Sequence, residues 1–427
     1  MLATIGLNSV EDLFSDIPEA IRESFRPLGF SPTSEMELAD RLGRMAAANT
    51  GATQTTFLGG GIYDHYIPSV VSHLLSRSEF VTAYTPYQPE ISQGTLTAMF
   101  EFQTFVSELT GMEVANASLY DGATALAEAA LMAERIRRRG GIAVARTLFP
   151  HLRRVLNTYA WAAEIELHEL PYDASGGCDL SDLPDNLSAV IVQTPNALGV
   201  IERLRGLKER IGDALLIVST YPLALGLLEP PGAFGADIVV GEGQSLGLPM
   251  AFGGPLLGLF ATRKAYLRQL PGRVAGRTVD AAGETGYVMA AQTREQHIRR
   301  GRATSNICTN SALCALAATI YLAAVGGEGL KQVARLNARK AHALARRIVE
   351  LDGFDLAFAG PFFNEFVIRT AEDPSAVKDR LAQAGFLVAS SSELTYFDVG
   401  SSLRIAVTEK RTEDELDRFV AVLEGSG

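Results

Sequence analysis

The stretch "LSAVIVQTPNALGVIERLRGLKERIGDALLIVST", residues 187–220, decides the fold. Its two ends, 187–193 and 214–220, are apolar runs without polar alternation, which is typical of strands covered on both faces. Residues 201–212 between them predict an amphipathic helix. A strand, a helix and a strand in this order predict two parallel strands of an α/β sheet with helices packed on its faces.

The same alternation extends from residue 112 to about 265, and further strands are expected at 142–146, 165–170, 236–240 and 255–261. The next segment, 266–306, predicts mostly loop with short elements. The uncharged apolar run 311–325 begins a helical region that reaches about residue 351, and the remaining tail predicts a small α+β unit. At 15 residues this run is shorter than the roughly 20 that a bilayer span needs, so we expect a buried helix of a cytoplasmic protein.

Helix ends are marked by local signals. Ser34 with Glu37, and Thr412 with Glu415, have the spacing of a capping box. The first sixty residues therefore predict an arm of short helices. An apolar stripe from Leu96 to Leu109 predicts a helix that stops at Gly111.

Composition excludes several classes of protein. The chain has 427 residues, of which 47% are hydrophobic and 20% charged, as in ordinary globular proteins. A net charge of -11 argues against a nucleic-acid-binding surface as the main function. Cys178, Cys308 and Cys314 have no metal-binding spacing and indicate a reducing compartment. The first residues carry no basic segment before their apolar residues, so a secretory signal is not expected.

The glycine-rich loop "GEGQSLG", residues 241–247, matches the pattern G-x-S-x-G after a predicted strand. This pattern makes Ser245 a candidate nucleophile of a serine hydrolase, but such an enzyme needs a helix to begin directly after the serine. The following "LPMAFGGP" does not predict a helix. The glycines also resemble a dinucleotide fingerprint with one residue too many.

The segment 115–141 leads through Ser118, Asp121 and Gly122 into an alanine-rich helix. The free N–H groups and the positive dipole end of such a helix favour an anion, such as a phosphate group. The alternative is that Asp121 only caps the helix, and its charge would itself repel a phosphate.

An arginine-rich segment runs from Arg273 to Arg302 and holds six arginines against three acidic residues. Such a cluster either receives carboxylates of a ligand or partner, or forms a solvated surface. His65 and His297 have no acid–base partner visible in the sequence, and we expect structural roles for both.

Five blocks, 84–96, 114–125, 235–255, 270–280 and 292–310, resemble the alpha chains, or subunit 1, of the two-chain P-protein of the glycine cleavage system. The resemblance extends over nearly the whole chain. It implies the aspartate-aminotransferase-like fold, fold type I of the pyridoxal-phosphate (PLP) enzymes. The implied domains are an N-terminal arm and helical segment (1–90), a large α/β domain with a mostly parallel sheet of the seven-stranded type (91–325), and a small α+β domain (326–427).

The family decarboxylates glycine, releases CO2 and passes the remaining aminomethyl group to the lipoyl arm of the H-protein. That chemistry uses PLP held by a Schiff-base lysine and by a carboxylate beside the pyridine nitrogen. This chain lacks both. None of its six lysines follows the strand 236–240, and the strand 214–220 ends without an aspartate before Tyr221.

The resemblance therefore implies that PLP is bound covalently by the second, beta subunit, with which this chain forms an alpha2-beta2 heterotetramer, and that no residue of this chain is catalytic on its own. Neither a metal, a nucleic acid nor a membrane is expected as a partner. Enzymes of this fold build each active site at a dimer interface. Two loops are placed to be lent to the partner, and the residues expected to act there are Tyr84, Tyr87, Gln88, Thr304, Ser305 and Asn306.

The loop 241–247 is then expected to border a vestigial pocket in this chain, lined by Ser118, Asp121, Gly122, Thr124, Gln244 and Ser245. Two alternatives remain open at this point: a serine hydrolase acting through Ser245, and a purely structural or regulatory subunit whose loops touch no chemistry.

Overall fold

A computed structural model describes residues 1–26, 28–82, 84–389 and 394–425 of the chain. It divides into two compact units, Met1–Gln54 and Thr55–Gly427. The first unit holds η1 (Leu2–Ile5), η2 (Glu11–Phe14), α1 (Glu19–Ser24), α2 (Glu35–Ala47) and η3 (Thr50–Ala52).

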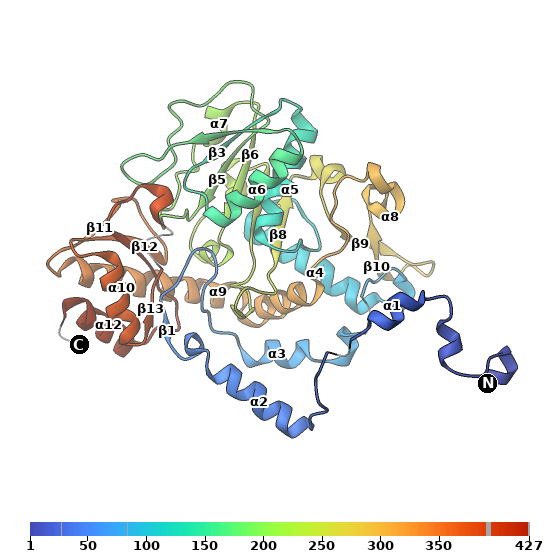
Figure 1. The fold of residues 1–427 in the computed structure, drawn as a ribbon. Helices are drawn as coiled ribbons and strands as arrows, with labels where there is room; N and C mark the ends of the chain where they lie inside the picture. Colours follow the sequence, from blue (N-terminus) through green and yellow to red (C-terminus); the bar gives the residue numbers. More distant parts are fainter. Residues whose placement is uncertain (27, 83, 390–393, 426–427) are drawn as a thin grey trace. The chain divides into compact units, whose positions relative to one another are not determined.

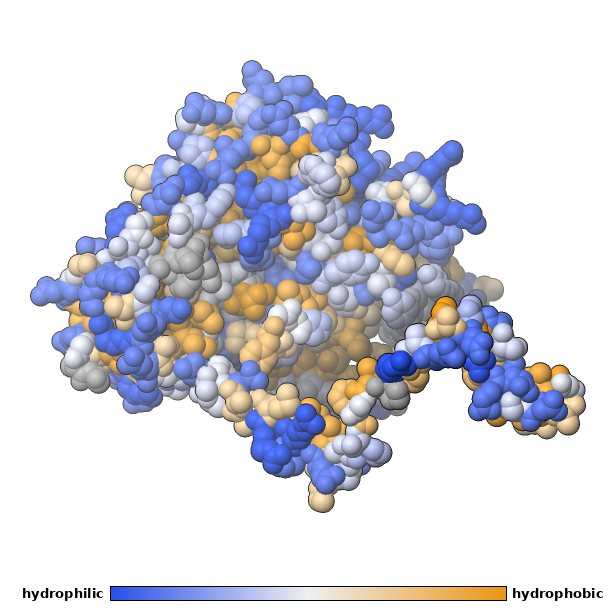
Figure 2. All heavy atoms as spheres, viewed as in Figure 1, coloured by the Kyte–Doolittle hydropathy of each residue, from blue (hydrophilic) through white to orange (hydrophobic). Residues whose placement is uncertain are grey.

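Helix α2 begins at the predicted capping box. The Ser34 side chain accepts from the backbone N–H of Glu37, and the Glu37 carboxylate accepts from the backbone N–H of Ser34. Large apolar side chains of this unit, including Phe14, Phe25 and Leu42, are exposed, and Figure 2 shows apolar surface along the segment. The arm of short helices expected from the sequence is thus present.

The core of the second unit is a seven-stranded sheet with the order β2-β8-β7-β6-β5-β3-β4. Figure 1 labels β3, β5, β6 and β8 of this sheet. Five neighbouring strands are parallel, and β8 runs antiparallel to both β7 and β2. The bounds are β2 (Val114–Ala115), β3 (Gly141–Ala145), β4 (Glu166–Leu170), β5 (Ala189–Thr194), β6 (Leu215–Thr220), β7 (Ile238–Glu242) and β8 (Gly258–Thr262). The six predicted strands are confirmed, and the two-residue strand β2 was missed.

Helices cover both faces of this sheet. On one face, α5 (Gly122–Arg137) and α6 (Pro150–Ala162) pack on side chains such as Ile191 and Ile217. On the other face, α4 (Gln93–Thr110), α7 (Leu207–Ile211) and α9 (Ala312–Val349) pack on the alternate side chains, such as Val192 and Val218. Helix α4 ends at Gly111, whose φ of 68° gives the left-handed cap that the sequence predicted.

The expected helix over 201–212 is wrong in extent, because only α7 is helical. Val200 pairs with Phe362 in a β-bridge, and the N–H of Ile201 donates to the carbonyl of Pro361. Gly206 then adopts a φ of 78°, which delays the start of the helix. A tertiary pairing thus overrides the helical periodicity of this segment.

Residues 263–310 contain short elements, as expected, which are helical turns and a hairpin, but the sequence did not predict the hairpin. The hairpin pairs β9 (Val274–Val279) with β10 (Thr285–Ala290). The turns are η8 (Lys264–Gln269), η9 (Gln292–Arg294), α8 (Gln296–Arg299) and η10 (Arg300–Arg302). The remaining elements that precede β7 in the second unit are β1 (Thr55–Thr56), α3 (Ser69–Leu75), η4 (Ser78–Phe80), η5 (Pro89–Ile91), η6 (Pro222–Gly226) and η7 (Pro231–Phe234).

The tail forms the predicted α+β unit, with the strand order β11-β12-β14. Figure 1 shows its elements gathered at one end of the second unit. They are β11 (Phe354–Leu356), β12 (Glu365–Thr370), α10 (Pro374–Gln383), β13 (Phe386–Leu387), η11 (Thr395–Phe397), β14 (Ser402–Ala406) and α12 (Glu413–Glu424). Helix α12 begins at the predicted capping box of Thr412 and Glu415.

Helix α9 connects the sheet core to this tail and leaves helical geometry at Gly326, which has a φ of 62°. Among the described residues it is the helix long and apolar enough to cross a membrane by length and composition alone. Residues 314–322 of α9 are buried in the core on one face of the sheet, as expected for the run 311–325.

Candidate functional site

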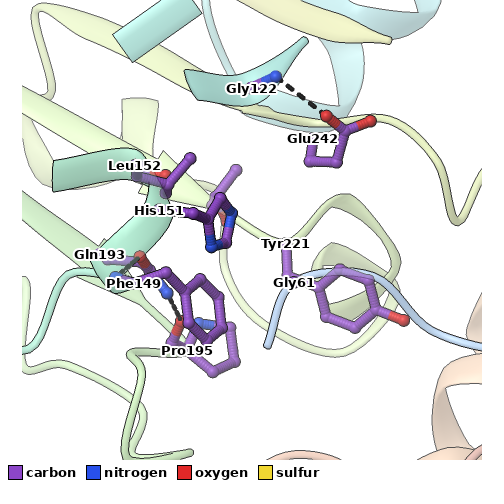
Figure 3. Close-up of a pocket in the computed structure, with 11 residues that line it drawn as sticks. Gly61, Gly122, Phe149, His151, Leu152, Gln193, Pro195, Tyr221 and Glu242 are labelled. Carbon is purple, nitrogen blue, oxygen red and sulfur yellow. Dashed lines mark hydrogen bonds between the residues drawn. The ribbon is translucent and has the colours of Figure 1, made fainter. Parts of the chain in front are cut away.

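A small cavity lies at the carboxyl ends of the parallel strands β5, β6 and β7. Gln193, Thr220 and Glu242 line it from the strand ends, and Gly122 and His151 line it from the starts of α5 and α6 (Figure 3). Ligands of open α/β sheets bind at this edge, because loops from several strands converge there. The cavity measures about 30 Å³, which leaves room for about two water molecules.

The start of α5 is satisfied by two carboxylates of the chain itself. Asp121 caps the helix, since its Oδ1 accepts from the N–H of Thr124 at 2.6 Å. The N–H of Gly122 donates to Oε2 of Glu242 at 2.9 Å, the contact dashed in Figure 3. The N–H groups of Gln244 and Leu257 donate to Oε1 of Glu242, each at 3.0 Å. Burial raises the pKa of Glu242 to about 7, against the lowering effect of the Gly122 and Leu257 hydrogen bonds.

The end of β6 holds Tyr221 instead of an acidic residue. The Tyr221 hydroxyl hydrogen-bonds to Nε2 of His65, whose Nδ1 lies 2.8 Å from the Glu409 carboxylate. Burial raises the pKa of Tyr221 well above its ordinary value. His65 therefore has an acidic partner 344 residues away, which the sequence could not reveal, and its structural role stays a prediction.

The loop after β7 is built around Gln244. Its side-chain amide is buried, accepts from the N–H of Tyr63 and donates to the carbonyls of Tyr63 and Leu248. Ser245 is also buried, and its Oγ forms no hydrogen bond with the residues that the structure describes. Residues 244–247 form a turn and no helix follows, so the serine hydrolase alternative is not supported.

The residues at this cleft do not fit PLP. No lysine lies between β7 and β8, and the six lysines of the chain are absent from the cavity lining. A carboxylate already accepts from the start of α5, where a phosphate group would bind. Among the described residues, no group of three or more His, Cys, Asp or Glu side chains could hold a metal ion.

Of the six residues expected to border a vestigial pocket, Gly122 is in the cavity lining. Ser118 has a φ of 94°, and its Oγ accepts from the N–H of Ser311 at the start of α9. Asp121 and Thr124 face each other in the helix cap, and Gln244 and Ser245 lie in the turn described above.

A second group of residues lies at the surface, where the loops 84–90 and 303–310 meet. A hollow of about 520 Å³ adjoins them, lined by Tyr84 and Pro86 from the first loop, by Asn310 from the second and by Ser311 at the start of α9. Tyr84 is 81% exposed and Tyr87 is 51% exposed.

The remaining residues expected to be lent lie on the same two loops. Gln88 and Asn306 are exposed, whereas Thr304 and Ser305 are partly buried. The N–H of Thr304 donates to the carbonyl of Arg294, and Oγ of Ser305 accepts from the N–H of Ile307.

Arg273 joins the two loops. Its Nη1 donates to Oγ1 of Thr85 at 3.0 Å and to Oγ1 of Thr309 at 3.1 Å. Its Nη2 donates to the Tyr87 hydroxyl at 3.3 Å and to the carbonyl of Cys308 at 2.9 Å. The Arg273 side chain is 2% exposed, and its Nε lies 3.7 Å from the Glu295 carboxylate. The planar guanidinium thus fixes one loop against the other.

The arginine-rich segment therefore does not act as one cluster. Arg273 and Arg294 are buried, and Arg294 donates to the carbonyls of Leu270 and Gly272. The other four arginines, which are Arg277, Arg299, Arg300 and Arg302, are exposed. The four exposed arginines agree with the solvated surface, and binding of a ligand's or partner's carboxylates by this segment stays a prediction.

The family model described as "Glycine cleavage system P-protein" matches residues 1–423. The chain is 49% identical to "Probable glycine dehydrogenase (decarboxylating) subunit 1" of Carboxydothermus hydrogenoformans, over 100% of this chain and 97% of the relative.

Among solved structures, a glycine decarboxylase (P-protein) of the glycine cleavage system in inhibitor-bound form matches with a TM-score of 0.93 and 45% identity, over 100% of this chain and 97% of that one. A glutamate decarboxylase of Lactobacillus brevis shares the fold at a TM-score of 0.68 and 14% identity, over 96% of each chain. The fold is that of the PLP-dependent enzymes of fold type I.

Proposed function

Because the chain belongs to the glycine cleavage system P-protein family and is a subunit of its decarboxylating glycine dehydrogenase, we propose that it completes an active site carried by the second subunit. The enzyme is an oxidoreductase that works as a complex of two kinds of subunit. In this proposal the second subunit binds PLP covalently, and this chain binds none. The product aminomethyl group passes to the lipoyl arm of the H-protein, in a cytoplasmic alpha2-beta2 heterotetramer.

The observation that carries this proposal is the position of Arg273. A buried guanidinium with four hydrogen bonds holds two polar loops whose outer side chains, Tyr84 and Tyr87, stay exposed. Ordering exposed loops costs conformational entropy, and a single chain gains little from their exposed side chains. An ordered polar surface beside a hollow is what a partner's active site would use.

The residues on these loops suit recognition of an anionic ligand by neutral groups. The hydroxyls of Tyr84 and Tyr87 and the amide of Gln88 can donate to a carboxylate or phosphate oxygen. Thr304, Ser305 and Asn306 can supply hydroxyl and amide donors from the opposite side. We assign the loops the tasks of binding the substrate or the cofactor's phosphate and excluding water, while the chemistry occurs on the partner.

The test compares variants in the reconstituted two-subunit enzyme by glycine–CO2 exchange with lipoylated H-protein. Tyr87→Phe and Asn306→Ala should each lower exchange by about tenfold, the effect of one lost hydrogen bond at the reacting complex. Tyr66→Phe is the matched control, because Tyr66 is exposed and lies outside both loops. Cofactor absorbance should follow the second subunit in every sample.

Three outcomes would contradict the proposal. Cofactor colour and exchange from this chain alone would show that it carries its own active site. Full activity of the second subunit without this chain would make the lent loops unnecessary. Normal turnover of a triple alanine variant at Tyr84, Tyr87 and Asn306 would leave the chain a structural or regulatory role.

A further inference from the structure

Three backbone N–H groups converge on one carboxylate in the cleft of this chain. They come from separate segments: Gly122 at the start of α5, Gln244 after β7 and Leu257 before β8. The acceptor, Glu242, is the last residue of β7 and lines the cavity. One of these donors, Gly122, is at a helix N-terminus, where an anion is favoured, and the other two come from loops beside β7 and β8.

The backbone is shaped around this acceptor. A Cβ atom on residue 122 would lie 3.0 Å from the backbone nitrogen of Glu242 and 3.1 Å from its Cβ, so a larger residue would press against the Glu242 backbone. Asp121 satisfies a further N–H of the same helix turn, that of Thr124. Two of the free N–H groups in the first turn of α5, those of Gly122 and Thr124, therefore have acceptors within the chain.

We propose that Glu242 is an internal anion, which occupies the place of a phosphate group in this cleft and closes it to phosphate esters. The carboxylate offers acceptors to the same N–H groups and compensates the positive end of α5. What remains beside it is a cavity of about 30 Å³, room for about two water molecules. The inference goes beyond the lent loops and does not depend on them, because it concerns only the chain's own cleft.

The proposal predicts that removing the carboxylate turns the cleft into a phosphate site. Glu242→Ala leaves three N–H groups without an acceptor and frees the volume of the side chain. Glu242→Gln keeps that volume filled, so phosphate should still be excluded. Glu209→Ala removes an exposed carboxylate elsewhere and controls for general effects of phosphate on stability.

The experiment uses the full-length chain at pH 8 with inorganic phosphate as the probe and chloride at matched ionic strength. Tenfold above its Kd, phosphate should raise the Tm of Glu242→Ala by about 2 °C more than those of the wild type, Glu242→Gln and Glu209→Ala. Phosphorus-31 NMR should show broadening of the free phosphate signal with Glu242→Ala only.

Equal responses of all four proteins, or no response of Glu242→Ala, would overturn the proposal. If Glu242→Ala does not fold in chloride, refolding from urea in phosphate replaces the melting experiment. Recovery of native circular dichroism in phosphate then supports the proposal, and failure to recover overturns it. Activity of the two-subunit enzyme is not used as a readout, so the outcome is separate from that of the lent loops.

Discussion

Replacing Arg273 by lysine tests whether the two surface loops must be held together. Lysine keeps a positive charge near Glu295, so it does not leave a buried carboxylate without a counter-charge. It replaces the planar fork, however, with a single nitrogen. One ammonium cannot donate to both Thr85 and Tyr87 on one loop and Thr309 and Cys308 on the other in the observed geometry.

The size of the effect follows from the bonds that are lost. We expect lysine to keep the bonds to one loop and lose two charge-assisted hydrogen bonds, worth about 1.5 kcal/mol each. Tyr87 is 51% exposed, and solvent reduces that sum. The free energy of unfolding should fall by about 2 kcal/mol. If the partner's active site depends on the arrangement of the two loops around Arg273, the same loss of about 2 kcal/mol lowers the exchange rate roughly 30-fold.

The assay is glycine–CO2 exchange in the reconstituted two-subunit enzyme, alongside urea unfolding of the chain alone. Arg277→Gln is the matched control, since Arg277 lies four residues further along the chain, in strand β9, with an exposed side chain. It should change neither measurement. Exchange of Arg273→Lys within twofold of the wild type, with the expected loss of stability, would refute the idea that the loops act as one surface.

Three further predictions concern the cleft. His65→Gln breaks at least one of the contacts to Glu409 and Tyr221 and should lower the free energy of unfolding by about 2 kcal/mol, whereas the exposed His73→Gln should not; equal values for both would contradict the network. The pKa of Glu242 is raised from 4.5 to about 7 in the folded chain. Its contribution to the free energy of unfolding is therefore complete below pH 4.5 and is lost as the pH rises through about 7. The unfolding free energy of the wild type should therefore fall relative to Glu242→Gln over this range in urea titrations, and a constant difference would argue against it. Gly122→Ala places a Cβ 3.0 Å from the Glu242 nitrogen and should cost about 1 to 3 kcal/mol, measured by urea unfolding against Gly94→Ala, a position in α4 with open space around it.

Local signals in the sequence account for much of the fold. Six of the seven strands of the main sheet follow from apolar runs, and the capping boxes at Ser34 and Thr412 mark helix starts. The two-residue strand β2 and the hairpin β9–β10 carry too little periodicity to be recognised. The helix expected over 201–212 shortened to α7 because residues 200 and 201 pair with the distant segment 361–362.

The site divides in the same way. The absence of a lysine after β7 could be seen in the sequence, and the candidate loops were found by resemblance. The contacts of Arg273, of Glu242 and of His65 with Glu409 could not be predicted, because each contact joins residues that are remote along the chain. The hydrogen bonds concerned span 186 and 188 residues for Arg273, 120 for Glu242 and 344 for His65.

The sequence by itself therefore determined the family, the layered α/β fold and the lack of a cofactor lysine, since these depend on residue identity and short-range periodicity. Only the tertiary structure decided what fills the cleft and what holds the surface loops. Hydrogen bonds of a few ångströms are formed by chain segments that folding brings together, and no pattern along the chain encodes their distance.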